Sequence, residues 1–219
     1  MSTVPEKPYL LYLGSAGDAP SIKMARGVRD WRGDWCIGEW SRPEARVSLG
    51  LPRLSPNDAV RVGARTMVVG VVNAGGVVPE DWLQDLREAL RAGLDLAAGM
   101  HVSLASLGDL ACLAERNGKR LHDLRLAKRV FPTGNGIKRL GNRILTVGTD
   151  CSVGKMYTAL AIEKELCKRG IAATFKATGQ TGCLIAESGI AIDAVVGDFV
   201  SGAVEWLSPD TESEHWDII

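Results

Sequence analysis

The sequence predicts an α/β protein made of two parallel-sheet domains, and three observations support this fold class. Short apolar runs alternate with amphipathic segments of helical period in the first half of the chain. A basic, turn-rich stretch without periodicity then divides the chain, and a glycine-rich loop follows an apolar run in the second half. Strands that alternate with helices along a chain are typical of parallel sheets whose faces are covered by helices.

Composition narrows the class of protein. The 219 residues are 46% hydrophobic, which is enough for one large or two small globular domains. Lys and Arg number 26, as do Asp and Glu, so no overall positive field attracts nucleic acid or an anionic membrane surface. No apolar run approaches the roughly 18 residues of a membrane helix and no signal segment is recognisable, so we expect a cytoplasmic protein. Five scattered cysteines without a CxxC pair predict reduced thiols.

The first domain is expected over residues 1–130 as a Rossmann-like α/β domain. Buried parallel strands are predicted at 9–13 and 66–72, the second followed by the turn Asn-Ala-Gly-Gly at 73–76. Beyond this turn, segments with apolar residues at helical spacing alternate with short apolar runs, which predicts alternating helices and strands. The further elements predicted here are a helix at 79–92, a strand at 94–98, a helix at 104–117 and a strand at 120–124. No GxGxxG spacing occurs, so we assign this domain no cofactor.

A linker is predicted at 131–142, within the stretch 119–143 that carries eight Lys or Arg against the single acid Asp123. These charges belong either to a solvated linker or to groups that face phosphates bound downstream. The second domain, 143–219, is predicted as an incomplete P-loop NTPase-like α/β domain. Its predicted elements are strands at 143–147, 172–176 and 193–196, helices at 155–168 and 200–207, and a strand beginning at 217. Because the sequence stops inside that strand, we expect a C-terminally truncated domain.

The glycine-rich loop Gly-Thr-Asp-Cys-Ser-Val-Gly-Lys at 148–155 is the clearest functional motif. It has one residue more between the first glycine and the Gly-Lys pair than the common GxxxxGK form. Glycines let successive N–H groups point into one concavity, the following helix adds its positive end, and the lysine supplies a cation for phosphate. The residues predicted to bind the cofactor are Gly148, Thr149, Asp150, Cys151, Ser152, Val153, Gly154, Lys155, Met156 and Tyr157.

Met156 occupies the position where such loops usually have Ser or Thr as a magnesium ligand. A thioether is a poor ligand for a hard cation, so the metal requirement stays open. A second polar segment follows the predicted strand at 172–176 and belongs to the edge of a parallel sheet where ligands bind. The residues predicted to orient a substrate there are Lys176, Thr178, Gln180 and Thr181.

The loop at 148–155 resembles the GTDTxVGK loop of dethiobiotin synthetase, and Lys176 falls where that enzyme has a lysine after its second strand. Nearly the whole chain resembles the domain-of-unknown-function family numbered 1611, in which Met follows the loop lysine. The segments that carry this resemblance are YLG at 12–14, GLP at 50–52, NAGG at 73–76, GTDCSVGKM at 148–156, ATGQTG at 177–182 and SGAVEWL at 201–207. In that family HWDII is followed by Glu-Gly and further glycines, which agrees with the expected truncation.

The family resemblance implies an N-acetyltransferase that uses acetyl-CoA, bound through the loop, to acetylate a D-amino acid such as D-glutamate. Lys155, Lys176 and Asp150 are then the catalytic candidates, although Asp150 as a loop aspartate is also suited to bonding its own backbone. The alternatives are an ATP-dependent ligase or kinase-like enzyme resembling dethiobiotin synthetase, which would need Mg²⁺, and a nucleotide-binding regulatory module. The expected partner is a small acidic substrate, with no nucleic acid and no membrane. Homo-oligomerisation stays open.

Overall fold

The computed structural model of the protein describes residues 4–72, 78–126 and 129–219. The chain forms two compact units, Met1–Leu126 and Ala127–Ile219. The predicted turn at 73–76 lies outside the described residues. No helix in the described part of the chain is both long and apolar enough to cross a membrane.

The first unit is built on a five-stranded parallel sheet in the order β2-β1-β3-β4-β5. All six residues of β1, which lies inside the sheet between β2 and β3, are buried, which explains why its apolar run lacks alternation. The strands are β1 (Tyr9–Gly14), β2 (Cys36–Ser41), β3 (Thr66–Val69), β4 (Asp95–Ala98) and β5 (Leu121–Asp123). The predicted parallel strands at 9–13 and 66–72 are therefore confirmed, although the second ends at Val69.

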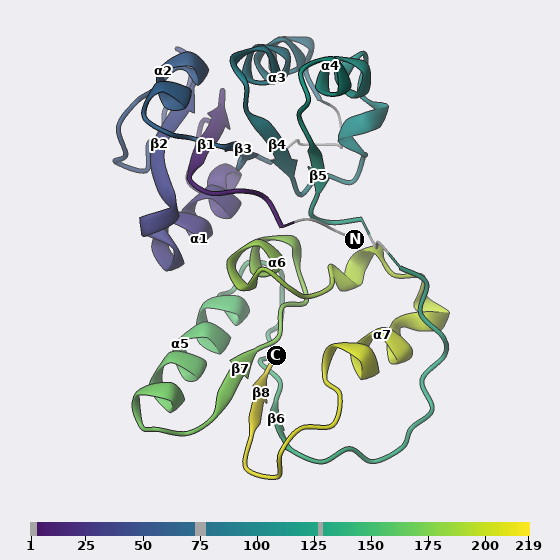
Figure 1. Cartoon of the computed structure of the whole chain (residues 1–219). Helices are drawn as coiled ribbons and strands as arrows, with labels where there is room; N and C mark the ends of the chain where they lie inside the picture. The colour runs from purple at the N-terminus through teal and green to yellow at the C-terminus, as the bar shows by residue number, and fades with distance from the viewer. Residues whose placement is uncertain (1–3, 73–77, 127–128) are drawn as a thin grey trace. The chain divides into compact units, whose positions relative to one another are not determined.

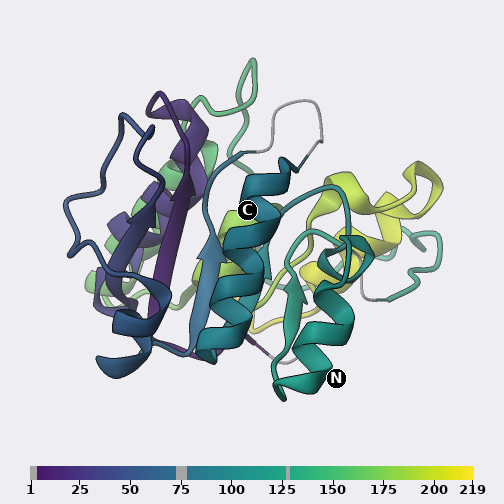
Figure 2. The same cartoon turned by 90° about the horizontal axis from the view of Figure 1, so that it is seen from above.

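Helices cover both faces of this sheet, with α3 and α4 on one face and α1 on the other (Figures 1 and 2). Strand order reverses at β1, because β2 lies on one side of it and β3 on the other, and right-handed crossovers then place α1 opposite the later helices. The helices are α1 (Lys23–Trp31), α2 (Pro56–Arg61), α3 (Glu80–Ala92) and α4 (Leu110–Arg116), with 3-10 turns η1 (Pro20–Ile22), η2 (Gly33–Trp35) and η4 (Leu104–Ser106).

A buried polar contact joins α3 to the sheet. The Tyr12 hydroxyl of β1 donates to Asp85 Oδ2 of α3 at 2.6 Å, and Arg42 Nη1 pairs with Asp85 Oδ1 at 2.9 Å. Burial, and then the hydrogen bond to Asp85, raise the pKa of Tyr12 above its usual range. The phenol therefore stays a neutral donor and fixes α3 over β1.

The prediction of one helix over 104–117 was wrong. The segment is divided into η4 and α4, because Gly108 between them adopts a left-handed φ of 54°. Asp123 at the end of β5 accepts hydrogen bonds from Ser103 Oγ and Leu104 N, which fixes the start of η4 separately from α4.

Strand β2 was missed in the sequence because its pattern is not apolar. A Cβ on Gly38 would lie 2.6 Å from Leu54 Cδ1, so glycine is needed where the next segment passes. Glu39 is fully buried and accepts from Ser48 Oγ at 2.5 Å and from Leu49 N at 2.6 Å. The strand carries a buried carboxylate that holds a loop, which hides it from a hydropathy pattern.

The second unit contains a three-stranded parallel sheet in the order β6-β8-β7. Helix α5 crosses from β6 to β7 and lies on the opposite side of the three strands from α7 (Figure 1). The strands are β6 (Asn142–Ile144), β7 (Ala173–Phe175) and β8 (Trp216–Ile218), and the helices are α5 (Lys155–Lys168), α6 (Gln180–Ala186) and α7 (Val200–Leu207), with 3-10 turns η5 (Ile192–Ala194) and η6 (Gly197–Phe199).

The predicted strand at 193–196 was also wrong. Residues of this segment belong to η5, and its apolar character comes from packing: Ile192 and Val195 lie against a buried cluster. The cluster consists of Phe131, Ile190, Ala203 and Leu207. The remaining strand of the sheet is β8, which pairs with β6 on one side and with β7 on the other.

The segment predicted as a linker, 131–142, is held against α7. Phe131 is 5% exposed, and Gly134 N donates to Ser201 Oγ at 2.9 Å. Asn135 N also donates to Glu205 Oε1 at 2.9 Å. These contacts, rather than a helix or strand of its own, fix the path of the segment into β6.

We predict that Gly202→Ala destabilises the protein while Gly197→Ala does not. A Cβ on Gly202 would lie 1.8 Å from the Pro132 carbonyl oxygen, whereas one on Gly197 meets no atom within 4 Å. Overpacking of this kind costs about 1–3 kcal/mol. Urea denaturation followed by circular dichroism measures the difference, and equal midpoints for the two variants would contradict the packing described.

Candidate functional site

The glycine-rich loop at 148–155 joins β6 to α5, as predicted. Sheet pairing continues past β6, because Ile219 N donates to the Ile144 carbonyl and Thr146 N donates to the Ile219 carbonyl, both at 2.8 Å. Thr146 Oγ1 lies 2.9 Å from the Ile219 carbonyl and 3.2 Å from the Lys155 carbonyl. The start of the loop is thus tied to the first turn of α5, so its two ends are held together.

Two residues with positive φ shape the backbone of the loop. Ser152 has φ of 60° and Gly154 has φ of 100°, so left-handed residues lie on either side of Val153 just before the helix begins. Turns that include left-handed residues can direct successive N–H groups toward one concavity, as anion-binding loops do. A Cβ on Gly148 would lie 2.6 Å from Val153 Cγ2, so the loop folds closely on itself. The 14-residue helix α5 adds its positive end to this concavity.

Lys155 is the cation of the loop. Its Nζ donates to the Asp150 carbonyl oxygen at 2.5 Å, across five residues of the loop. The ammonium group therefore lies back over the loop that precedes it. A phosphate oxygen is a charged acceptor and offers this ammonium a stronger hydrogen bond than a carbonyl does.

The remaining loop residues have separate roles. Asp150 Oδ1 accepts from Cys151 N at 2.6 Å, so this carboxylate bonds its own backbone. Thr149 and Cys151 are exposed, Met156 is half-buried at the start of α5, and Tyr157 is 37% exposed. Solvent-facing main chain with one lysine makes the loop accessible to a phosphate group.

The second predicted segment, residues 176–182, was expected to be a turn, but its second half begins a helix. Gln180 and Thr181 are the first two residues of α6, while Thr178 lies in the short connection from β7. Lys176 follows β7 directly, and its backbone N–H donates to the Ile218 carbonyl at 2.8 Å. The segment is therefore a strand-to-helix junction in the same sheet as the loop.

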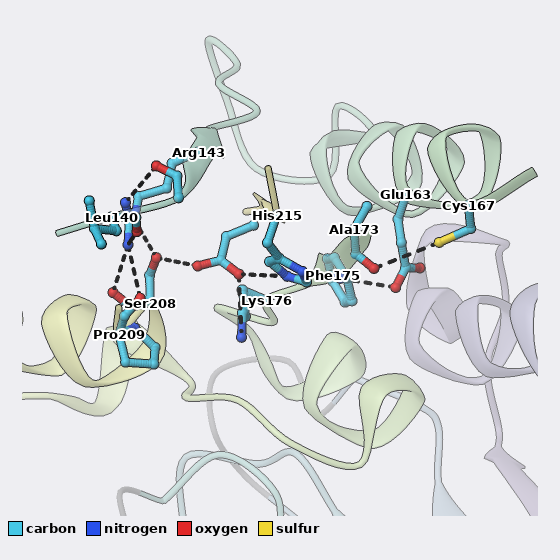
Figure 3. Close-up of polar contacts among 12 residues, drawn as sticks. Leu140, Arg143, Glu163, Cys167, Ala173, Phe175, Lys176, Ser208, Pro209 and His215 are labelled. Atoms are coloured by element: carbon cyan, nitrogen blue, oxygen red, sulfur yellow. Dashed lines mark hydrogen bonds and ion pairs between the residues drawn. The ribbon is translucent and has the colours of Figure 1, made fainter. Parts of the chain in front are cut away.

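A buried polar network, missed in the sequence, lies beside Lys176 (Figure 3). Asp217 of β8 is fully buried, and Lys176 Nζ lies 3.4 Å from its Oδ1. His215 Nε2 lies 3.5 Å from the same oxygen. The other oxygen, Oδ2, accepts a 2.5 Å hydrogen bond from Ser208 Oγ, which in turn accepts from Arg143 Nε at 2.6 Å.

Arg143 is held entirely by neutral acceptors. Its Nη atoms donate to main-chain carbonyl oxygens on both sides of the β6 entrance, including Pro209 at 2.9 Å and Leu140 at 3.0 Å. Nearby, Arg139 Nη2 pairs with Glu205 Oε2 at 3.0 Å. These two arginines of the basic stretch are therefore engaged in structural contacts. No signal in the sequence indicated this network, because residues in contact within it lie far apart along the chain, as do Arg143 and Ser208, which are 65 residues apart.

No metal centre is apparent in the part of the chain that the structure describes. Across residues 4–72, 78–126 and 129–219 there is no group of three or more His, Cys, Asp or Glu side chains placed to hold an ion. Main-chain amides, hydroxyls and Lys155 are the groups of the loop that suit a phosphate, while the Asp150 carboxylate bonds its own backbone.

Two parallel-sheet units, the second with a phosphate-binding type of loop, define a two-domain α/β protein of the Rossmann-like and P-loop type. The chain belongs to the DUF1611 family. The model of that family's Rossmann-like N-terminal domain matches residues 41–127, and the model of its P-loop C-terminal domain matches residues 132–219. The resemblance predicted from the sequence is confirmed.

Named relatives and a solved structure agree with this assignment. A D-glutamate N-acetyltransferase of Tritonibacter scottomollicae is 49% identical over 214 residues, and one of Pseudoalteromonas sp. is 49% identical over 212. These alignments include 98% and 97% of this chain, which spans 64% of the length of each relative. The crystal structure of a DUF1611 family protein from Anabaena variabilis has a TM-score of 0.82 and 27% identity, covering 97% of this chain and 65% of that one.

We predict that phosphate ligands protect Cys151 from alkylation. Cys151, Cys112 and Cys167 are exposed, whereas Cys36 is buried and burial raises the pKa of its thiol to about 12. Iodoacetamide at pH 8 should modify the three exposed thiols and spare Cys36. Saturating pyrophosphate should slow modification of Cys151 several-fold and leave Cys112 and Cys167 unchanged, as measured by peptide mass spectrometry. Equal slowing at all three, or none at Cys151, would argue against a ligand in the loop.

Proposed function

We propose that the protein is an N-acetyltransferase that transfers the acetyl group of acetyl-CoA to the amine of a D-amino acid such as D-glutamate. The observation that carries the proposal is the name of two relatives, each 49% identical across both units of this chain. Their similarity runs through the loop and through the junction at Lys176 rather than through one domain alone.

The loop geometry supports a coenzyme that carries phosphate. The pyrophosphate of acetyl-CoA would be held by the N–H groups of residues 148–155 and by Lys155, once its ammonium exchanges the Asp150 carbonyl for a phosphate oxygen. We assign Asp150 a structural role in the loop rather than a role in proton transfer, because its Oδ1 already accepts a hydrogen bond from Cys151 N.

The chemistry of acetyl transfer fits the residue types present. The neutral amine attacks the thioester carbonyl and a tetrahedral oxyanion forms. The C–S bond then breaks, the proton lost by the amine ends on the departing thiolate, and the products are the N-acetyl amino acid and the coenzyme thiol. Lysine side chains stabilise the developing negative charge, and bound reactants gain from orientation. No phosphoryl group is transferred in this reaction, so Met156 at the usual magnesium-ligand position is compatible with it.

Substrate orientation is assigned to the junction between β7 and α6. We propose that the amino acid contacts Lys176, Thr178, Gln180 and Thr181. These residues follow β7, which pairs with β8, and β8 pairs on its other side with β6, the strand before the loop. Ligands of parallel α/β sheets bind outside the carboxyl ends of the strands.

A second candidate is ATP-dependent phosphoryl transfer, which the likeness of the loop to that of dethiobiotin synthetase favours. In that reaction Lys155 and Lys176 would stabilise the transferring group and Mg²⁺ would be required. A regulatory module would bind nucleotide and release no product.

Calorimetric titration of the full chain with acetyl-CoA and with ATP, each with and without Mg²⁺, tests the proposal. We expect acetyl-CoA to bind without metal, and Lys155→Ala to weaken that binding at least about tenfold through loss of a charge-assisted hydrogen bond. Lys168→Ala, a change of the same type at the exposed end of α5, is the matched control and should leave affinity unchanged.

Binding of ATP alone, and only with Mg²⁺, would overturn the acetyltransferase proposal in favour of phosphoryl transfer. An equal loss of affinity in both lysine variants would show that the effect is one of net charge rather than of the loop.

A further inference from the structure

We infer that Lys176 and His215 together form a subsite for a carboxylate of the amino-acid substrate, with Asp217 as the positioning residue behind them. The inference rests on the proposed function, because it names the residues by which that site would select an acidic amino acid. It adds His215 and Asp217 to a site otherwise assigned to the β7–α6 junction.

Two nitrogen donors converge on one oxygen from different segments of the chain. Lys176 Nζ and His215 Nε2 lie 3.4 and 3.5 Å from Asp217 Oδ1, so the two nitrogens are within about 7 Å of each other. One reaches it from beyond β7 and the other from the residue before β8 (Figure 3). The two oxygens of a single carboxylate can accept from donors at such a separation.

The accessibility of the three side chains divides their roles. Asp217 is fully buried, whereas the side chains of Lys176 and His215 are 20% and 22% exposed. A ligand can therefore touch the two nitrogen-bearing side chains but not the carboxylate. Asp217 acts through them, which makes it a positioning residue rather than a catalytic one.

The geometry at Oδ1 points to donors that are free to turn toward a ligand. Although this oxygen is buried, no donor among the described residues completes a hydrogen bond to it, and the two ion-pair distances exceed those of a closed contact. A buried ion pair that served only stability would be expected to form a hydrogen bond, since leaving a buried acceptor without one is costly. Lys176 and His215 thus keep hydrogen-bonding capacity that a substrate carboxylate can use.

Asp217 is itself fixed from the other side. Ser208 Oγ donates to Oδ2 at 2.5 Å and accepts from Arg143 Nε at 2.6 Å. Arg143 contributes a positive charge through this hydroxyl while its remaining donors are engaged by carbonyls. Two permanent cations against one carboxylate leave the cluster with an excess of positive charge, which suits an anionic group.

The first unit offers a contrasting pair. His122 Nε2 lies 3.5 Å from Asp95 Oδ2, the same separation as at His215, but His122 is only 3% exposed and Arg120 Nε donates to that oxygen at 2.9 Å. In this second pair the carboxylate oxygen is engaged by Arg120, and the histidine is inaccessible. It serves as an internal control, because a ligand effect on histidines in general would include it.

Nuclear magnetic resonance of the histidine rings tests the subsite without depending on turnover. The chain has three histidines, His101, His122 and His215, and His215→Leu identifies the third resonance. We expect D-glutamate, and glutarate as a dicarboxylate without an amine, to shift the His215 ring signals and leave those of His101 and His122 in place. A stationary His215 signal at saturating D-glutamate would overturn the subsite.

Steady-state kinetics supply the second readout. His215→Leu and Asp217→Asn should each raise the KM for D-glutamate about tenfold with a smaller change in kcat, and should leave the Kd for acetyl-CoA unchanged. His101→Leu, at an exposed position of the first unit, is the matched control and should change neither value. An unchanged KM in His215→Leu would contradict the inference.

The two proposals fail separately. If the unaltered protein forms no N-acetyl product, the proposed function is wrong, while a shift of the His215 signal by glutarate still supports a carboxylate subsite. If product forms and neither the signal nor the KM responds, the subsite alone is wrong. Should Asp217→Asn fail to fold by circular dichroism, His215→Leu and the resonance shift decide the question.

Discussion

The buried carboxylate of Asp217 is the constraint around which the second unit is organised. It lies in β8, the central strand of a three-stranded sheet, and a charge in that position needs compensation from several elements. Ser208 at the end of α7, Arg143 in β6 and Lys176 after β7 provide it. One residue therefore connects all three strands with α7, and it also determines where the Lys176 ammonium lies.

The loop at 148–155 depends on the same strands. Thr146 and Ile219 extend the pairing of β6 with β8 to the beginning of the loop, and the Thr146 hydroxyl contacts the first residue of α5. Lys155, at the end of the loop, and Lys176, at the β7–α6 junction, thus both follow strands of one three-stranded sheet. The proposed phosphate contact of the first depends on the local main-chain geometry of the loop, and the second lies 3.4 Å from the buried Asp217 carboxylate.

Sequence reasoning succeeded where the determining interactions are local. The glycine pattern at 148–154 predicted a strand, loop and helix, which the structure has between residues 142 and 168, and β1 and β3 were recognisable as apolar runs. It failed at β2, whose buried Glu39 resembles a surface residue, and at 193–196, where apolar residues serve a cluster rather than a strand. The Arg143–Ser208–Asp217 network could not be inferred, because its contacts join segments that only the fold brings together.

Product formation is the most direct test of acetyl transfer by this family member. The full chain would be incubated with acetyl-CoA and D-glutamate, without ATP or Mg²⁺, and N-acetylglutamate measured by mass spectrometry, with L-glutamate as the stereochemical control. We expect the coenzyme thiol and N-acetyl-D-glutamate to form in equal amounts, with no N-acetyl product from L-glutamate. Absence of product under these conditions, with turnover appearing only when ATP and Mg²⁺ are added, would contradict it.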